Sequence, residues 1–214
     1  MEAMVHLISN RTTIVRRRIR GFSLLELVIS VAIILILSAI IAPRMMNVTY
    51  AVKLRSAAYD MSGAIQKGRI ESVRRNIFIS MRQTTLAAGD TDYYVDLNRN
   101  TTLDTSDPQV VVPRGVTVFF GTGSGAPGEA AFVASLGFAP DATGVLPSFN
   151  ARGLPCIPNV TNTLCPALPG GGFVYFLSDS QLSGNTATAW CAIAVTPSGR
   201  VQTWTYDGAG WRQL

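Results

Sequence analysis

One acidic side chain, Glu26, stands at the head of an apolar run that is otherwise suited to a membrane. From Leu27 to Ala42 the only polar side chains are Ser30 and Ser38, and a helical serine can return its hydroxyl proton to a backbone carbonyl one turn back. An ionised carboxylate in apolar surroundings costs several kcal/mol unless a cation pairs with it. Glu26 therefore needs a cation, which comes either from the basic residues just before the run, such as Arg20, or from another molecule.

A second group of side chains that could do chemistry is the run of oxygen donors in YYVDLNRNTTLDTSD, residues 93–107. Calcium prefers several carboxylate or amide oxygens converging from one short loop. The run departs from an EF-hand loop at Thr101, where the sharp turn needs glycine, and at Asp107, which is a short last ligand. We favour an exposed turn with no cofactor, because Asp and Asn side chains bond their own backbone in turns. The candidate calcium ligands are Asp96, Asn98, Asn100 and Asp104.

Catalytic constellations are missing from the sequence after the apolar run. The only histidine, His6, precedes the run, which excludes a Ser-His-Asp or Cys-His arrangement beyond it. The glycine-rich GTGSGAPG at 121–128 lacks the lysine of a phosphate-binding loop. Cys191 has no base in its sequence neighbourhood. The sequence therefore predicts a protein that is not an enzyme.

All three cysteines follow the apolar run. Cys156 and Cys165 are nine residues apart in a proline-rich loop, so we expect them to form a disulfide in an oxidising compartment and to leave Cys191 free in a strand. A zinc site would need a fourth ligand and closer spacing.

The apolar run is long enough to cross a membrane. Its 21 residues from Phe22 to Ala42 would span about 31 Å as a helix, close to the ~30 Å hydrocarbon core of a bilayer. A cleaved secretory signal peptide is the alternative, but its apolar region would be about 7 to 15 residues long and would end at small residues.

The charge lies mainly before this run. Residues 1–20 hold five arginines and one glutamate, a net charge of +4, whereas the remainder holds 13 basic and 12 acidic residues. The overall basic charge is therefore no argument for a nucleic-acid-binding protein. Under the positive-inside rule the N-terminus stays in the cytoplasm, and the residues after Pro43 lie on the far side of the inner membrane.

Beyond Pro43 the sequence predicts the second half of one long, proline-kinked helix. Leu54, Ala58, Met61 and Ile65 recur at spacings of four, three and four residues among charged positions, which is the pattern of an amphipathic helix. We expect this helix to end at Asn76 and to lie on the domain that follows.

The rest of the chain is rich in short β-branched and aromatic segments separated by glycine and proline clusters. TPSG at 196–199 is a turn that should join the last two strands in a hairpin. A helix followed by strands with tight turns predicts an α+β fold with an antiparallel sheet. The expected strands are Ile77–Met81, Tyr93–Leu97, Val110–Phe120, Ala131–Phe138, Phe173–Leu177, Ala189–Val195 and Arg200–Tyr206.

The stretch RGFSLLELVISVAIILILSAIIAP resembles the class III signal of type IV prepilins and pseudopilins. The resemblance implies that prepilin peptidase cuts between Gly21 and Phe22 and methylates the new amine of Phe22. It also implies that Glu26, at the fifth mature position, pairs with the Phe22 amine of a neighbouring subunit, and that Pro43 kinks the helix. The expected parts are a leader at 1–21, a transmembrane and filament-core helix at 22–42, an amphipathic helix at 43–76 and a periplasmic domain at 77–214.

The C-terminal part resembles the minor pseudopilins typified by GspH of type II secretion and FimT of type IV pili. The segments AVTPSGRVQTWTY, FNARGLP and YYVDLNRNTTLDTSD carry this resemblance. It implies a pilin-like subunit that acts by membrane anchoring and filament assembly, with prepilin peptidase, other pilins and membrane lipid as partners. The alternative that it implies is a DNA-binding minor pilin for DNA uptake, which would use Arg200, Trp204 and Arg212.

Overall fold

The computed structural model describes residues 22–87, 89–159, 161, 163–168, 170–182 and 189–214, with the backbone alone at 42–44. The expected leader, including Gly21, lies outside the described residues. The chain divides into two compact units, Met1–Pro43 and Arg44–Leu214, and helix α1, Leu24–Arg75, begins in the first and ends in the second. Each unit is described by itself.

In the first unit, α1 is apolar on all sides. The Oγ atoms of Ser30 and Ser38 donate hydrogen bonds to the carbonyl oxygens of Glu26 and Ile34, both at 2.7 Å. The two serines thus satisfy their hydroxyl groups within the helix, as predicted. By length and composition, α1 can cross a membrane.

In the second unit, α1 is amphipathic in the predicted register. Leu54, Ala58, Met61 and Ile65 are all fully buried. The helix ends at Arg75, and Asn76 adopts a positive φ of 54°, a conformation that asparagine tolerates at helix ends. The expected end of the helix is therefore correct.

Two antiparallel sheets follow α1, and a short parallel pairing joins β5 to β8. The first sheet has the order β3-β2-β1-β6-β7 and the second the order β11-β10-β9-β8-β4. The first contains β1 (Ile79–Thr85), β2 (Thr91–Asp96), β3 (Gln109–Val112), β6 (Ser148–Phe149) and β7 (Pro155–Cys156). The second contains β4 (Val116–Phe120), β8 (Gly171–Asp179), β9 (Trp190–Val195), β10 (Val201–Tyr206) and β11 (Trp211–Gln213), while β5 is Ala139–Pro140 and a 3₁₀ turn covers Ser180–Leu182.

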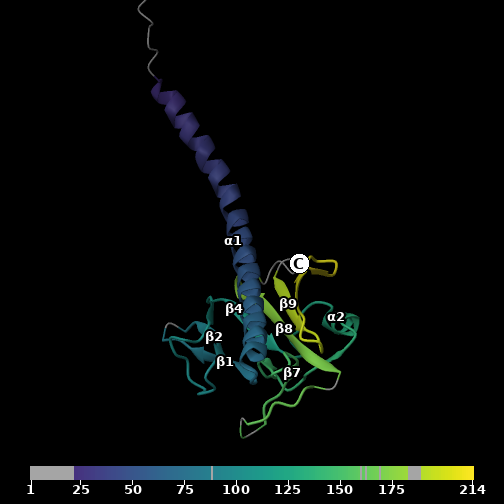
Figure 1. Cartoon of the computed structure of the whole chain (residues 1–214). Coiled ribbons are helices and arrows are strands. Elements are labelled where there is room, and N and C mark those ends of the chain that lie inside the picture. The colour runs from purple at the N-terminus through teal and green to yellow at the C-terminus, as the bar shows by residue number, and fades with distance from the viewer. Residues whose placement is uncertain (1–21, 88, 160, 162, 169, 183–188) are drawn as a thin grey trace, which may run out of the picture. The chain divides into compact units, whose positions relative to one another are not determined.

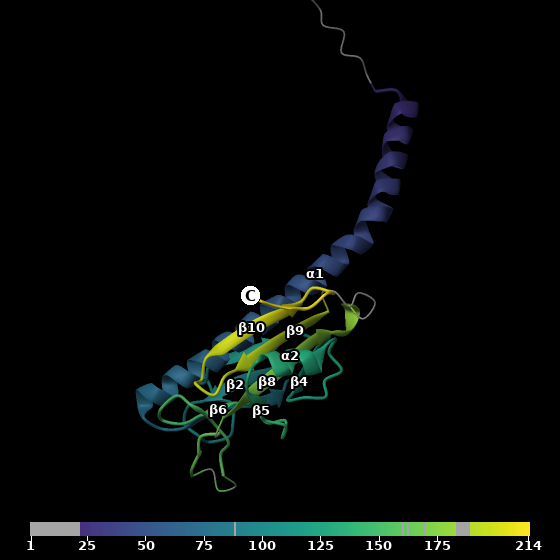
Figure 2. The ribbon, with the colours of Figure 1, turned by 90° about the vertical axis from the view of Figure 1, so that its right-hand side faces the viewer.

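The main core lies where α1 meets the inner faces of both sheets. Figure 1 shows the second half of α1 between β1 and β2 on one side and β8 and β9 on the other. Along β8, Phe173, Tyr175 and Leu177 join the core on the α1 side, while Val174 and Phe176 join a second cluster under helix α2, Glu129–Ser135. Figure 2 shows α2 in front of β8 and β9, with α1 behind them. The α+β architecture with antiparallel sheets is as predicted.

The predicted strand Val110–Phe120 is wrong, because the structure breaks it into two. β3 ends at Val112, and the amide of Val116 closes a turn on the carbonyl oxygen of Pro113 at 3.1 Å, with Gly115 at φ 92°. β3 and β4 then belong to different sheets. The sequence Pro-Arg-Gly at 113–115 is typical of such a turn, because glycine adopts a positive φ without steric strain.

The predicted strand Ala131–Phe138 is also wrong, because helix α2, Glu129–Ser135, covers most of it. Three alanines favour the helix. Glu129 accepts hydrogen bonds from the amides of Gly123 and Gly125 and from the hydroxyl of Ser124, while Phe132 is buried on the second sheet. The remaining predicted strands exist with shifted ends, and β9 and β10 form the predicted hairpin.

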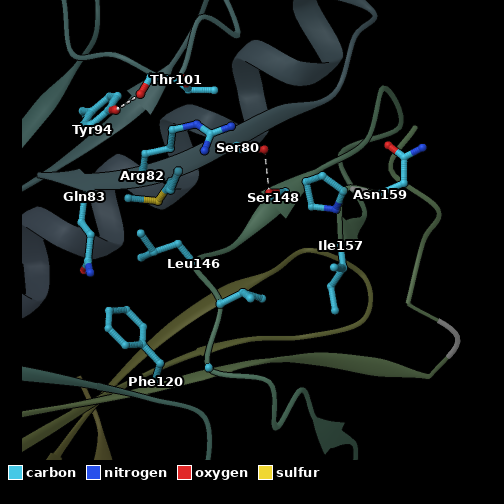
Figure 3. Close-up of a pocket in the computed structure, with 14 residues that line it drawn as sticks. Ser80, Arg82, Gln83, Tyr94, Thr101, Phe120, Leu146, Ser148, Ile157 and Asn159 are labelled. Carbon is cyan, nitrogen blue, oxygen red and sulfur yellow. Dashed lines mark hydrogen bonds between the residues drawn. The ribbon is translucent and has the colours of Figure 1, made fainter. Parts of the chain in front are cut away.

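Strand β6 accompanies β1 for only part of its length. The two strands share the pairs Ile79↔Phe149 and Ser80↔Ser148, and the two serine hydroxyls hydrogen-bond at 2.8 Å. Figure 3 shows this contact beside a hollow between the sheets.

Candidate functional site

The N-terminal segment presents its key side chains to the exterior. Phe22 is 74% exposed, and Glu26, which is also exposed, lies in the first turn of α1. A carboxylate there is favoured by the partial positive charge of the helix N-terminus. Within the described residues Glu26 forms no ion pair; the alternative partner, Arg20, and the cleavage-site residue Gly21 lie outside them.

The apolar half of α1 finds no cover in the chain. Every described large hydrophobic side chain of this half, from Phe22 to Ile41, is exposed. Such a surface is stable only against lipid or other apolar helices. Pro43 lies within α1, where its backbone alone is described. Together these features give a surface for insertion and packing that carries one carboxylate in need of a cation.

The oxygen-rich loop uses its side chains for internal hydrogen bonds. Asp96 accepts the amides of Asn100 and Thr101 at 3.1 and 3.0 Å, and Asp107 accepts that of Leu97 at 3.0 Å. Hydrogen bonds from Ser106 hold the pKa of Asp104 below its ordinary value.

Asn98 and Asn100 also turn their side-chain amides toward the carboxylate of Asp104. Among the described residues, no group of three or more His, Cys, Asp or Glu side chains could hold a metal ion. These bonds are those of an Asn- and Asp-rich turn, and the calcium site stays a prediction.

The three residues expected for DNA binding do not converge. Trp204 packs its ring on Phe132 of α2, with centroids 5.4 Å apart. Arg212 pairs in register with Thr205, the next residue along β10, so its side chain belongs to the opposite face of the sheet from Trp204. Arg200 directly precedes β10 and is five residues before Thr205. Five residues of a strand extend about 16 Å, so Arg200 lies far from Arg212, the partner of Thr205.

Arg212 is further occupied by an ion pair with Asp207. Arg200 is exposed and has no ion pair in the part of the chain that the structure describes. Trp204 therefore serves packing, and of the three expected residues Arg200 is the exposed cation that has no ion pair among the described residues.

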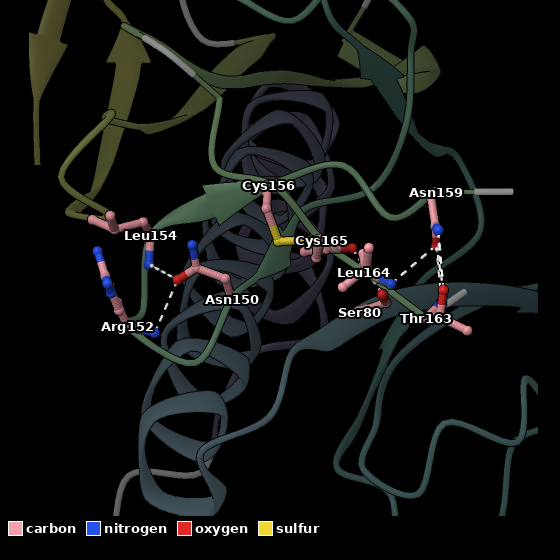
Figure 4. The surroundings of a disulfide bond; sticks show 10 residues. Ser80, Asn150, Arg152, Leu154, Cys156, Asn159, Thr163, Leu164 and Cys165 are labelled. Atoms are coloured by element: carbon pink, nitrogen blue, oxygen red, sulfur yellow. Dashed lines mark hydrogen bonds between the residues drawn. A yellow bond between two sulfur atoms is a disulfide. The ribbon is translucent and has the colours of Figure 1, made fainter. Parts of the chain in front are cut away.

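Cys156 and Cys165 form a disulfide with Cα atoms 5.4 Å apart, the pair expected from the sequence. Figure 4 shows it beside the turn that Asn159 organises by accepting the amides of Thr163 and Leu164. Cys191 is a free, buried cysteine in β9. Burial raises the pKa of its thiol to about 11, which keeps it protonated and unreactive.

Arg69 has a structural role that the sequence did not reveal. Its guanidinium donates to the carbonyl oxygens of Gly153 and Ser198, at 3.1 and 3.2 Å, and so joins α1 to two loops. A Cβ atom at Gly199 would collide with the carbonyl oxygen of Gly153. The glycines in FNARGLP and TPSG were the signal that could have predicted this close approach.

A family model described as the prokaryotic N-terminal methylation motif matches residues 16–42. The N-terminal segment of the chain is therefore similar to that of type IV prepilins. The match covers the basic cluster, Phe22, Glu26 and the apolar half of α1.

Among solved structures, the type IV minor pilin FimU of Pseudomonas aeruginosa matches this chain with a TM-score of 0.43 and 13% sequence identity. The match covers 74% of this chain and 92% of FimU. Similarity at this level carries no inference about the chain. No curated protein sequence matches it.

Proposed function

We propose that this pilin-like protein is a minor subunit of a type II secretion pseudopilus or a type IV pilus. The observation that carries the proposal is the methylation motif at 16–42, whose apolar helix is wholly exposed and holds one carboxylate. In this proposal residues 22–42 hold the subunit in the inner membrane, with the N-terminus in the cytoplasm and the domain in the periplasm. The subunit then assembles into a filament, at or near its tip.

Processing and assembly are linked through one charge pair. Cleavage between Gly21 and Phe22 creates an amine four residues before Glu26. A carboxylate and an amine that are each costly alone in lipid become tolerable together. The pairing of Glu26 with the Phe22 amine of the next subunit would make assembly the step that neutralises both.

The mature N-terminus tests the first part of this proposal. Mass spectrometry of the protein from membranes should find chains that begin with N-methylated Phe22. Gly21→Leu should block processing, because a bulky side chain keeps the peptidase from the backbone. Gly63→Ala is a matched control, because Gly63 faces open space. A Gly21→Leu protein that still begins at Phe22 would remove the cleavage-site assignment.

Crosslinking in intact membranes with mass spectrometry of the neighbours tests which machine the subunit serves. Secretion pseudopilins as neighbours would support a pseudopilus, and major pilins would support a pilus. DNA uptake is the alternative function, for which the exposure of Arg200 is the favouring observation. Salt-sensitive DNA binding that Arg200→Ala reduces and Arg152→Ala leaves intact would support this alternative.

A further inference from the structure

Part of strand β1 has an unpaired edge. β1 pairs with β2 from Ser80 to Thr85, but on its other side the last contact with the β6 segment is the amide of Met81, which donates to Pro147 at 3.0 Å. Alternate residues of an antiparallel strand direct both backbone groups to the same side. The N–H and C=O groups of Gln83 and Thr85 therefore face away from β2, and no strand in the described ranges pairs with them there.

A groove of about 670 Å³ lies along this edge. Figure 3 shows Gln83, Leu146 and Phe120 of β4 around the hollow. A second hollow of about 290 Å³ shares Gln83 and Phe120 as lining residues and is also lined by Thr85. Gln83, on the unpaired edge, therefore lines both hollows.

Among the described residues that line the groove, Arg82 is the one charged side chain and none is acidic. Arg82 donates its Nε to Asp96 at 2.8 Å, and Asp96 is 1% exposed, whereas the Arg82 side chain is 30% exposed. The carboxylate of Asp96 also holds two loop amides. The ion pair fixes the guanidinium, and its terminal nitrogens have no further partner among the described residues.

We propose that this groove binds an extended, acid-bearing segment of a partner protein by strand addition to β1. The backbone of the segment would pair with Gln83 and Thr85, where an unpaired strand edge is a template for another chain. The residue opposite Arg82 would be acidic, because directly opposed side chains share one face of a sheet. The residues opposite Gln83 and Thr85 would be apolar, since they point to the inner face beside Phe120.

An extended chain fits these features better than a compact ligand does. The unsatisfied groups form a row with the two-residue period of a strand, and the charge and the apolar surface lie on alternate faces of that row. The inference concerns the second unit alone and does not depend on the proposed role in a filament.

A defined peptide tests the proposal. The probe is a fluorescein-labelled Thr-Val-Thr-Val-Glu with a blocked C-terminus, which in antiparallel pairing puts its valines opposite Thr85 and Gln83 and its glutamate opposite Arg82. It is titrated against the full chain in detergent micelles and followed by fluorescence anisotropy. We expect saturable binding. Replacing the peptide glutamate with glutamine should weaken binding about tenfold, because a charge-assisted hydrogen bond is lost. N-methylation of both valines should abolish it.

On the protein, Gln83→Pro removes one edge N–H without touching the bonds to β2 and should also abolish binding. Gln83→Ala, which keeps the N–H, is the matched control and should bind normally; circular dichroism checks that both variants are folded. No saturable binding up to millimolar protein, or equal binding of the N-methylated peptide, would overturn strand addition. Equal binding of the glutamine peptide would overturn the preference for an acidic segment.

Discussion

The two halves of α1 are continuous in sequence but opposite in their surroundings. In the first unit the helix exposes Leu35 and Ile36 at 64% and 63%, whereas in the second unit Leu54 and Met61 are fully buried. Both halves have large apolar surfaces that are unfavourable in water. The second half buries its apolar face against the two sheets of its own unit, whereas no described part of the chain buries the first half.

This difference separates folding from assembly. The buried face of the second half contributes to the stability of the domain through packing and removal of apolar surface from water. The first half contributes nothing to that core, so its effect must arise in lipid or against another subunit. Substitutions in the two halves should therefore change different measurements.

The largest expected effect is that of Glu26→Ala on assembly. Loss of a carboxylate whose partner remains buried costs about 3 kcal/mol, or roughly a hundredfold, so incorporation into filaments should fall by about that factor while peptidase cleavage continues. Immunoblots of sheared filaments and membranes would measure this ratio. Ser30→Ala is the control in the same half, and normal incorporation of Glu26→Ala would contradict the pairing.

Next is a pair of truncations, Met61→Ala and Ile36→Ala. The first leaves a cavity in the core and should lower the free energy of unfolding of the domain by about 3 kcal/mol. The second removes an exposed side chain and should leave the free energy of unfolding unchanged. Denaturant unfolding of the full chain in detergent would give both values, and equal losses would break the distinction between the two halves.

Removal of the disulfide should have a slightly smaller effect. Cys156 and Cys165 are nine residues apart. The crosslink between them lowers the conformational entropy of the unfolded chain, which stabilises the folded protein by about 2.5 kcal/mol. The double substitution to serine should lower unfolding stability by that amount and leave membrane insertion unchanged. Cys191→Ser is the control for loss of a thiol without loss of a crosslink, and no difference between oxidised and reduced protein would contradict the estimate.

The smallest effect is a pH dependence inside the domain. Asp92 is 1% exposed, and burial raises its pKa above the ordinary value. A raised folded-state pKa adds stability below the unfolded value of 3.8, and that stability is lost as the pH rises through the folded value. Asp92→Asn should therefore raise the unfolding free energy at pH 7 by about 1 kcal/mol, and the gain should disappear as the pH falls below the unfolded value of 3.8.

Asp104→Asn should change the free energy of unfolding in the opposite direction to Asp92→Asn. Hydrogen bonds from Ser106 lower the pKa of Asp104, so its stabilising effect is present above the unfolded pKa and is lost as the pH falls through the folded value. The substitution should destabilise the domain at pH 7 and have little effect at low pH. Thermal unfolding of both variants across this range would measure the two signs, and two shifts of the same sign would contradict the assignment.

The features predicted correctly from the sequence depend on residues that follow one another at short, regular spacings. The positions of Leu54, Ala58, Met61 and Ile65 on one face of α1, and the hairpin at TPSG, follow from local periodicity and turn chemistry. The Cys156–Cys165 pair was expected because the two residues are near each other in the chain. Each of these interactions joins residues that are close in sequence.

The wrong predictions fell where distant contacts decide. By composition the segment around Phe132 could form a strand or a helix, and the helical form packs Phe132 on Phe176 of β8 and Trp211 of β11, which are far from it in sequence. The segment Val110–Phe120 was predicted to be one strand because it is rich in β-branched residues. Its two parts, β3 and β4, pair with β2 and β8 in different sheets. Short apolar segments are ambiguous until their partners are known.

The sequence by itself determined the N-terminal segment of this protein, because an apolar run of membrane-spanning length, a basic flank and one carboxylate are local properties of the chain. Only the tertiary structure decided which residues of the second unit are available for binding. It placed Trp204 in packing beneath α2, engaged the oxygen-rich loop in its own hydrogen bonds and left the edge of β1 unpaired beside Arg82. Strand pairing joins residues far apart in sequence, so an unpaired edge has no local signature in the chain.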